Sequence, residues 1–175
     1  ALAYFSKRDF EHAIADFSSD AKMTPDPYYY VGRGIVYAAL GDCDRAIDDY
    51  DEAIKLEPCY PRVYNYRGNC LRKKGDLDAA ISDYSREIKI NPNEPVVYFN
   101  RGVVLKMQGK FSDAIDDLSR AVAINPKYAM AYFVRADTYI DEGDLDSADR
   151  DFKTASMLDP SLDRRSTHLE VPPIN

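Results

Sequence analysis

The chain has 175 residues, of which 45% are hydrophobic and 30% are charged. That balance is typical of a folded chain and too apolar for a disordered one. The formal net charge of −7 disfavours nucleic acids and anionic membrane surfaces as partners, because both would repel an acidic protein. No apolar run approaches the ~18–20 residues that a membrane-spanning helix needs, so we predict no membrane span.

The cysteines and histidines form no recognisable metal or catalytic pattern. Cys43, Cys59 and Cys70 are odd in number and include no CxxC pair, while His12 and His168 are far apart in the sequence. We therefore predict reduced thiols, no metal site and no disulfide framework, which favours a reducing, cytoplasmic location. The sequence also lacks a P-loop, a GxGxxG and a GxSxG motif, so we predict no cofactor and no enzymatic activity.

Self-comparison reveals a repeat with a step of 34 residues. The step links four prolines, four glycines, four alanines and four tyrosines: Pro58, Pro92, Pro126 and Pro160; Gly41, Gly75, Gly109 and Gly143; Ala46, Ala80, Ala114 and Ala148; and Tyr30, Tyr64, Tyr98 and Tyr132. The predicted repeats, in chain order, are an incomplete one at 1–26 and complete ones at 27–60, 61–94, 95–128 and 129–162. Because most of the first helix of the incomplete repeat is missing, we expect the chain to begin inside a longer protein. The tail, 163–175, loses the pattern and is predicted to be a capping helix or a linker.

Each complete repeat is predicted to form two antiparallel helices, as repeat 95–128 illustrates. Tyr98, Gly102 and Leu105 fall on one face of the first helix. Gly109 supplies the left-handed residue that ends this helix, and the residue before Pro126 is pushed out of the helical region and ends the second one. N-caps of the second helices are predicted at Asp44, Asp78, Ser112 and Asp146. Small residues are predicted to face one another across each helix pair: Gly34, Gly68, Gly102 and Ala136 opposite Ala46, Ala80, Ala114 and Ala148.

The small, small, aromatic and proline signature, for example Gly68, Ala80, Tyr84 and Pro92, resembles the tetratricopeptide repeat family over residues 1–162. The resemblance implies an all-α fold, a right-handed α-solenoid of 34-residue helix-turn-helix repeats. It also implies that the first helices lie side by side and line a concave groove that binds a partner protein. No single helix pair can bury its apolar stripe alone, so neighbouring repeats are expected to stack.

Arginine and aspartate also recur with the repeat. The positions are Arg33, Arg67, Arg101 and Arg135 on first helices and Asp16, Asp49, Asp83, Asp117 and Asp151 on second helices. Each arginine lies beside a small, buried position, and an isolated buried guanidinium is costly, so we predict Arg–Asp pairs. Two registers are open: Arg33 with Asp49 within a repeat, or Arg33 with Asp16 between neighbours, and we favour the second. A row of arginines that binds a ligand is the alternative interpretation.

A second stripe on the first helices is not used by the predicted core. It is apolar at both ends with a polar, basic patch between them, which is the pattern that a peptide-binding groove needs. The predicted partner-binding residues are Val31, Ile35, Arg62, Asn65, Tyr66, Asn69, Phe99, Asn100, Val103, Lys106, Phe133, Val134 and Asp137. The alternative is that Val31, Phe99 and Phe133 only pack one helix against the next.

Three functional hypotheses follow. The first is a non-enzymatic scaffold or adaptor that binds a linear peptide or a partner helix in the groove. The second is the repeat arm of a larger enzyme, such as a glycosyltransferase, isomerase or phosphatase, with catalysis outside this fragment, and the third is self-association through the incomplete first repeat. Some family members clamp the C-terminal tails of chaperones, but only Asn69 and Asn100 match that clamp. Asn65, Met130 and Val134 occupy its other positions, so we do not expect chaperone tails as ligands.

Overall fold

The computed structural model describes residues 9–162, and their regular elements are α-helices followed by a single 3-10 turn. The predicted all-α fold is therefore confirmed for this part of the chain. The chain divides between Pro92 and Asn93 into two compact halves, each with its own packing. The predicted capping helix or linker at 163–175 lies outside the described residues.

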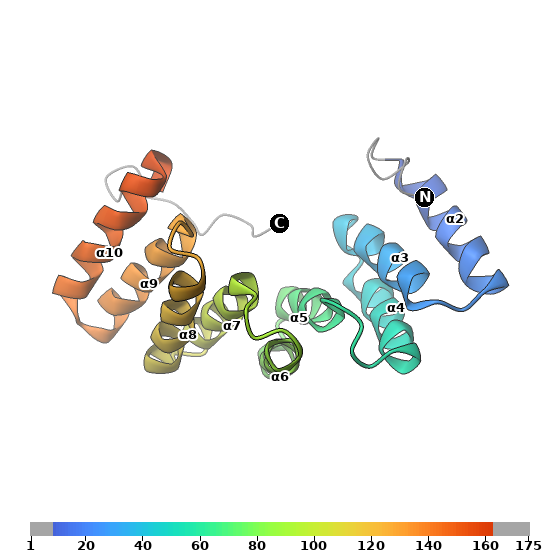
Figure 1. Cartoon of the computed structure of the whole chain (residues 1–175), viewed down its shortest axis with the longest axis horizontal. Helices are drawn as coiled ribbons and strands as arrows, with labels where there is room; N and C mark the ends of the chain where they lie inside the picture. Colours follow the sequence, from blue (N-terminus) through green and yellow to red (C-terminus); the bar gives the residue numbers. More distant parts are fainter. Residues whose placement is uncertain (1–8, 163–175) are drawn as a thin grey trace. The chain divides into compact units, whose positions relative to one another are not determined.

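The N-terminal half holds the second helix of the incomplete repeat and two complete helix pairs (Figure 1). Its helices are α2 (Phe10–Met23), α3 (Pro27–Ala39), α4 (Cys43–Leu56), α5 (Val63–Lys74) and α6 (Leu77–Ile90). Each helix packs against the next one in the chain, and α3 also contacts α5. The two first helices of this half, α3 and α5, are therefore neighbours.

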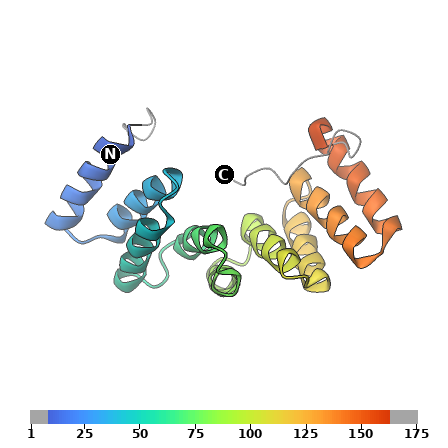
Figure 2. The same cartoon turned by 180° about the vertical axis from the view of Figure 1, so that it is seen from behind.

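The C-terminal half repeats this arrangement with two further pairs (Figure 2). Its elements are α7 (Pro95–Met107), α8 (Phe111–Ile124), α9 (Ala129–Glu142), α10 (Leu145–Leu158) and the 3-10 turn η1 (Pro160–Leu162). The first helices α7 and α9 contact each other, and η1 packs against both α9 and α10. All four complete helix pairs lie inside the predicted 34-residue repeats.

The turns between paired helices use glycine as the sequence predicts, but the N-caps differ from the prediction. Gly109 has φ +74°, a backbone conformation that disfavours other residues, and no atom would contact a Cβ there within 4 Å. The second helices start earlier than expected, so the caps are Asp42, Asp76 and Asp144, whose carboxylates accept backbone N–H bonds. The predicted caps Asp44, Asp78 and Asp146 lie in the first turn instead. Ser112 also lies within its helix, after an N-cap residue, Lys110, that makes no side-chain cap bond.

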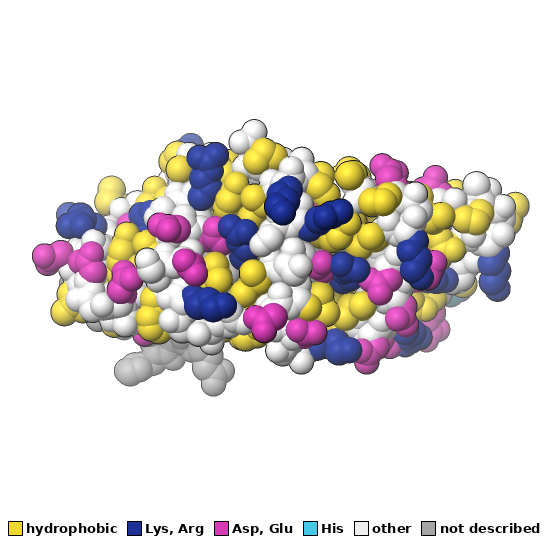
Figure 3. All heavy atoms as spheres, turned by 90° about the horizontal axis from the view of Figure 1, so that it is seen from below, with side chains coloured by type: hydrophobic (Ala, Val, Ile, Leu, Met, Phe, Trp, Pro, Cys, Tyr) yellow, Lys and Arg dark blue, Asp and Glu magenta, His cyan; other side chains and the backbone are white. Residues whose placement is uncertain are grey.

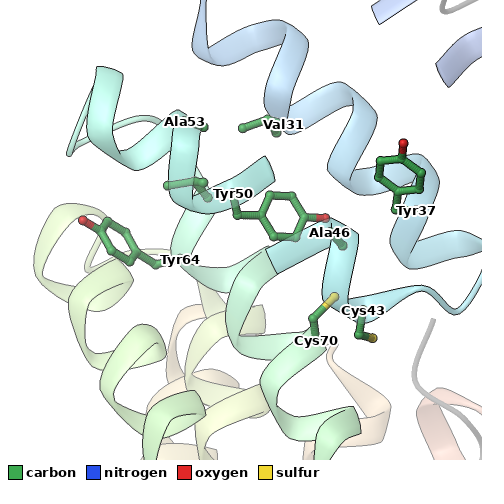
Figure 4. Packing of buried hydrophobic residues seen from close by; sticks show 9 residues of the cluster. Val31, Tyr37, Cys43, Ala46, Tyr50, Ala53, Tyr64 and Cys70 are labelled. Atoms are coloured by element: carbon green, nitrogen blue, oxygen red, sulfur yellow. The ribbon is translucent and has the colours of Figure 1, made fainter. Parts of the chain in front are cut away.

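A large side chain of the second helix fills the space that each first-helix glycine leaves open. A Cβ on Gly34 would lie 2.6 Å from the Tyr50 ring, and one on Gly68 would lie 2.8 Å from the Tyr84 ring. The nearest groups are thus these rings, one turn beyond the predicted alanine partners. Figure 4 shows Tyr50 among the buried residues of the first complete repeat. The glycines therefore let a bulky side chain of the second helix lie directly against the first-helix backbone.

Candidate functional site on the first helices

The arginine ladder pairs within each repeat, which corrects the register that we favoured from the sequence. Arg33 donates from Nε and Nη2 to the two carboxylate oxygens of Asp49, at 2.9 and 2.6 Å. Asp16 is not its acceptor in these contacts. The same two-pronged geometry joins Arg67 to Asp83, Arg101 to Asp117 and Arg135 to Asp151. Two parallel bonds to a carboxylate form the strongest geometry available to arginine.

The remaining guanidinium nitrogen reaches the preceding repeat. Arg33 Nη1 donates to Ser18 Oγ at 2.8 Å, and Arg135 Nη1 donates to Ser119 Oγ at 2.9 Å. At the equivalent place Arg67 Nη1 meets the carboxylate of Asp51 instead of a serine. The hydrogen bonds to the carboxylate of Asp83, and the one to the carboxylate of Asp51, raise the pKa of Arg67 above its ordinary value, because together they outweigh the effect of burial. The arginines are thus committed to internal contacts, and a ligand-binding row is not supported.

The predicted binding residues of the N-terminal half divide into buried and accessible ones. Val31 and Asn65 are buried, Ile35, Tyr66 and Asn69 are half-buried, and Arg62 is exposed. The Tyr66 ring stacks on Tyr50, with 6.0 Å between ring centroids. The Asn69 carboxamide oxygen accepts a 2.8 Å bond from the Tyr84 hydroxyl. Tyr66 is therefore held by the second helix of the preceding repeat and Asn69 by the second helix of its own, while part of each side chain remains accessible.

Tyr28 is the most open aromatic side chain on the first helices of this half. It lies in the first turn of α3 and is 43% exposed. Its ring packs edge-on against Tyr29 and Phe17, at centroid distances of 5.5 and 6.3 Å. An aromatic ring that is fixed by its neighbours and still exposed is suited to contact a partner with little loss of side-chain entropy.

Sequence analysis missed Glu87, a buried carboxylate in α6. It is 1% exposed and occupies the repeat position that is Ala53, Ala121 and Ala155 elsewhere. Its Oε1 accepts a 3.2 Å bond from the backbone nitrogen of Arg62, which has φ +64° and precedes α5. Because Arg62 makes no side-chain cap, Glu87 supplies an acceptor at the start of that helix. The signal was visible as one acidic residue at a position where the other three complete repeats have alanine.

In the C-terminal half most predicted apolar anchors are buried. Phe99 is 2% exposed, and its ring lies 5.1 Å from that of Tyr128. Asn100, Val103 and Val134 are buried as well. For these residues the structure places the side chains in helix packing, the alternative interpretation that the sequence left open. Phe133 is only half-buried and meets Phe152 edge-on at 5.3 Å.

The predicted residues Lys106 and Asp137 come together between α7 and α9. Lys106 Nζ lies 2.6 Å from Asp137 Oδ2 and 2.9 Å from Asp141 Oδ2. Burial disfavours the ammonium, but the two carboxylates prevail and raise the pKa of Lys106 above its ordinary value. Asp141 was not predicted, although its spacing of four residues from Asp137 places both on one helix face. This cluster ties the two first helices of the C-terminal half together.

The described residues contain no cluster of metal ligands, and charges of both signs are mixed on the face that Figure 3 shows. Among residues 9–162 no group of three or more potential metal ligands occurs. No helix in that range has the length and hydrophobicity to cross a bilayer. Figure 3 shows basic and acidic side chains interspersed with hydrophobic ones on the face in view. A cavity of about 530 Å³ lies near the turn between α3 and α4, and Cys43, Lys73 and Lys74 are among the residues that line it.

The fold and these first-helix faces define an all-α helical-repeat protein. Profiles described as tetratricopeptide repeat match residues 1–55 and 31–95, and others with the same description match 95–128 and 129–162. The chain belongs to the tetratricopeptide repeat family, as its sequence signature predicts.

Curated relatives match a short part of the chain. The "Small glutamine-rich tetratricopeptide repeat-containing protein 2" of Mycosarcoma maydis is 33% identical over 67 residues, which is 38% of this chain and 19% of that protein. Its namesake in Saccharomyces cerevisiae is 31% identical over 64 residues, 36% of this chain and 18% of that protein. The chain thus spans less than a fifth of the length of either relative in these matches.

Solved structures share the fold over nearly the whole chain. A structure titled "Crystal structure of MamA" has a TM-score of 0.85 at 24% identity and covers 91% of this chain and 94% of its own. MamA from Desulfovibrio magneticus RS-1 has a TM-score of 0.85 at 20% identity, covering 91% of both chains. YrrB, titled "a TPR protein with an unusual peptide-binding site", has a TM-score of 0.80 at 20% identity and covers 96% of this chain and 88% of its own. At these identities the likeness establishes the fold.

Proposed function

We propose that the protein is a non-enzymatic interaction scaffold that binds a peptide or a partner helix on its first helices. The observation that carries the proposal is the set of aromatic side chains that remain accessible there, above all Tyr28, which is 43% exposed. Ring contacts with neighbouring residues hold Tyr28 and the half-buried Phe133 and Tyr66 in place. YrrB, which shares the fold, is described as a TPR protein with an unusual peptide-binding site, and this supports a peptide ligand here.

Burial changes the roles that we assign to the predicted residues. Phe99, Val31, Val103 and Val134 set the spacing between helices, because their side chains are buried by internal packing. The apolar contacts to a partner are assigned to the accessible residues Ile35, Tyr66 and Phe133.

The polar contacts orient the ligand. Arg62 and Asn69, at the start of α5 and on it, and the ion-paired Lys106 and Asp137, on α7 and α9, are assigned to these contacts. Asn65 and Asn100 are buried and are assigned to the support of the helices that carry them. Apolar anchors flanked by polar groups provide affinity and register, respectively.

The test begins with peptides selected on the full chain from a random display library. Their dissociation constants are then measured for the wild type, for Tyr28→Ala, and for Phe133→Ala. We expect at least one of these variants to bind about tenfold more weakly, equivalent to ~1.4 kcal/mol. Met157→Ala is the matched control, because Met157 is exposed and lies on the second helix α10. Equal affinity in all variants, or an equal loss in the control, would refute the assignment.

A second candidate is that these repeats form one arm of a larger multidomain protein, including an enzyme whose catalytic centre lies elsewhere. The observation that favours it is that the matched segment makes up only 19% of one curated relative and 18% of another, so most of each relative lies outside the match. Determining the complete reading frame separates the candidates. A scaffold has repeats and linkers around this segment, whereas the second candidate requires a recognisable catalytic domain.

A cytoplasmic location belongs to the same proposal. It rests on the odd number of cysteines, Cys43, Cys59 and Cys70, which disfavours a disulfide framework and favours a reducing compartment. Fractionation of cells that express the full-length protein, with the thiols blocked at lysis, tests both the location and the thiol state.

A further inference from the structure

Two cysteines from neighbouring repeats lie together in the N-terminal half. Cys43 is the first residue of α4 and Cys70 lies on α5, and both are buried in the same cluster as Tyr50. Figure 4 shows the Cys70 and Cys43 side chains next to each other. Burial, followed by the interaction with Cys43, raises the pKa of Cys70 to about 12, while the charge of Lys73 acts in the opposite direction.

The two thiols differ in access. Cys43 lines the cavity of about 530 Å³, together with Lys73 and Lys74, whereas Cys70 is not among its lining residues. Lys74 is engaged by the Asp44 carboxylate at this rim. Cys43, which lines this open pocket and is 8% exposed, is therefore more accessible to a small oxidant than Cys70, which is 2% exposed.

We propose that Cys43 and Cys70 are a modification site: a dithiol pair that hydrogen peroxide converts to a reversible disulfide between α4 and α5. The Cys43 sulfur, as thiolate, attacks one peroxide oxygen, the O–O bond breaks, and the departing hydroxide takes up a proton to become water. Cys43 is then a sulfenic acid. The Cys70 sulfur attacks the Cys43 sulfur, an S–S bond forms, the S–O bond breaks, and the hydroxyl leaves as water with the Cys70 proton. In sum, two thiols and one peroxide give one disulfide and two waters.

The disulfide would covalently cross-link one repeat to the next. Cys43 belongs to repeat 27–60 and Cys70 to repeat 61–94, whose first helices α3 and α5 are neighbours. Reduction by a dithiol reagent reverses the bond by thiol–disulfide exchange. The inference depends on the packing of α4 on α5 and not on the proposed binding function, so the two can fail separately.

The test uses the full chain with Cys59→Ser, which removes the exposed third thiol and its intermolecular disulfides. After treatment with hydrogen peroxide, we expect the intact mass to fall by two hydrogen atoms and both maleimide-reactive thiols to be lost. We also expect a proteolytic fragment that joins the Cys43 and Cys70 peptides. Dithiothreitol should restore both thiols.

Two further variants fix the order of events. With Cys70→Ser added, Cys43 should stop at the sulfenic acid, which dimedone traps. With Cys43→Ser added, Cys70 should remain a free thiol at the same peroxide dose. Oxygen addition without a cross-link in the two-thiol chain would overturn the proposal, as would two unmodified thiols or a disulfide between separate molecules.

Discussion

Replacing Arg67 by methionine tests how much the internal ion pairs stabilise the N-terminal half. The Arg67 side chain is 22% exposed, and its partner Asp83 is 8% exposed. Arg67 also contacts Asp51, which is more open, so most of the loss comes from Asp83 left buried without its counter-ion. Breaking a fully buried pair costs ~3–5 kcal/mol, and partial exposure of the guanidinium lowers our expectation to about 2–4 kcal/mol.

Urea unfolding of the full chain, followed by circular dichroism, measures this loss. Lys55→Met is the matched control, because Lys55 forms an exposed ion pair with Glu52 on a helix surface and should leave stability nearly unchanged. Adding Asp83→Leu to Arg67→Met should recover stability, since the buried carboxylate is then removed as well. A loss below about 1 kcal/mol for Arg67→Met, or no recovery in the double variant, would refute the reasoning.

Three other substitutions test separate elements of the fold. Gly34→Ala should cost about 1–3 kcal/mol in urea unfolding, because the new Cβ would lie 2.6 Å from the Tyr50 ring; a neutral result would contradict the close approach. Glu87→Ala should cost about 1–3 kcal/mol by removing the acceptor of the Arg62 backbone N–H, and Glu87→Gln should retain most of that stability, so equal losses would argue against a hydrogen-bonding role. Asp144→Ala should destabilise α10, and bonding to Ser147 lowers the pKa of this carboxyl below its ordinary value of 3.8. The stability it adds is thus present above pH 3.8 and is lost as the pH falls through the lower folded value, so thermal unfolding of wild type and variant should converge in acid.

The repeat period was enough to predict the helices, because it places the turn glycines and helix-ending prolines at fixed intervals. It was also enough to predict that Arg33 and its equivalents pair with aspartate. It did not fix the register of those pairs, because Asp16 and Asp49 occupy equivalent positions on the two second helices that flank Arg33. The N-caps were misplaced for a related reason, since acidic residues stand both at the cap and two residues later, as at Asp42 and Asp44.

The candidate site was harder to predict, because the exposure of a side chain depends on neighbouring residues that differ from one repeat to the next. Phe99 and Phe133 occupy the same repeat position, yet Phe99 is buried and Phe133 is half-buried. Phe99 is covered by Tyr128, and the residue one repeat later than Tyr128 is Leu162. A smaller, aliphatic side chain at that place offers less surface to cover a phenylalanine ring. Burial at one position is therefore set by the residue that ends the same repeat.

Comparing the repeats also separates residues that serve the fold from residues with a role in one repeat only. A repeat position occupied by the same residue throughout serves the fold, as the paired arginines do. Departures from the repeat mark contacts that occur once: Glu87 where the other complete repeats have alanine, Cys70 on a first helix, and Asp141 beside Lys106. If the modification site resides in such a departure, exchanging Cys70 for the valine that stands at this position in two other repeats should preserve the helices and abolish only the disulfide. If this exchange unfolded the chain, the separation of fold from individual function would be wrong.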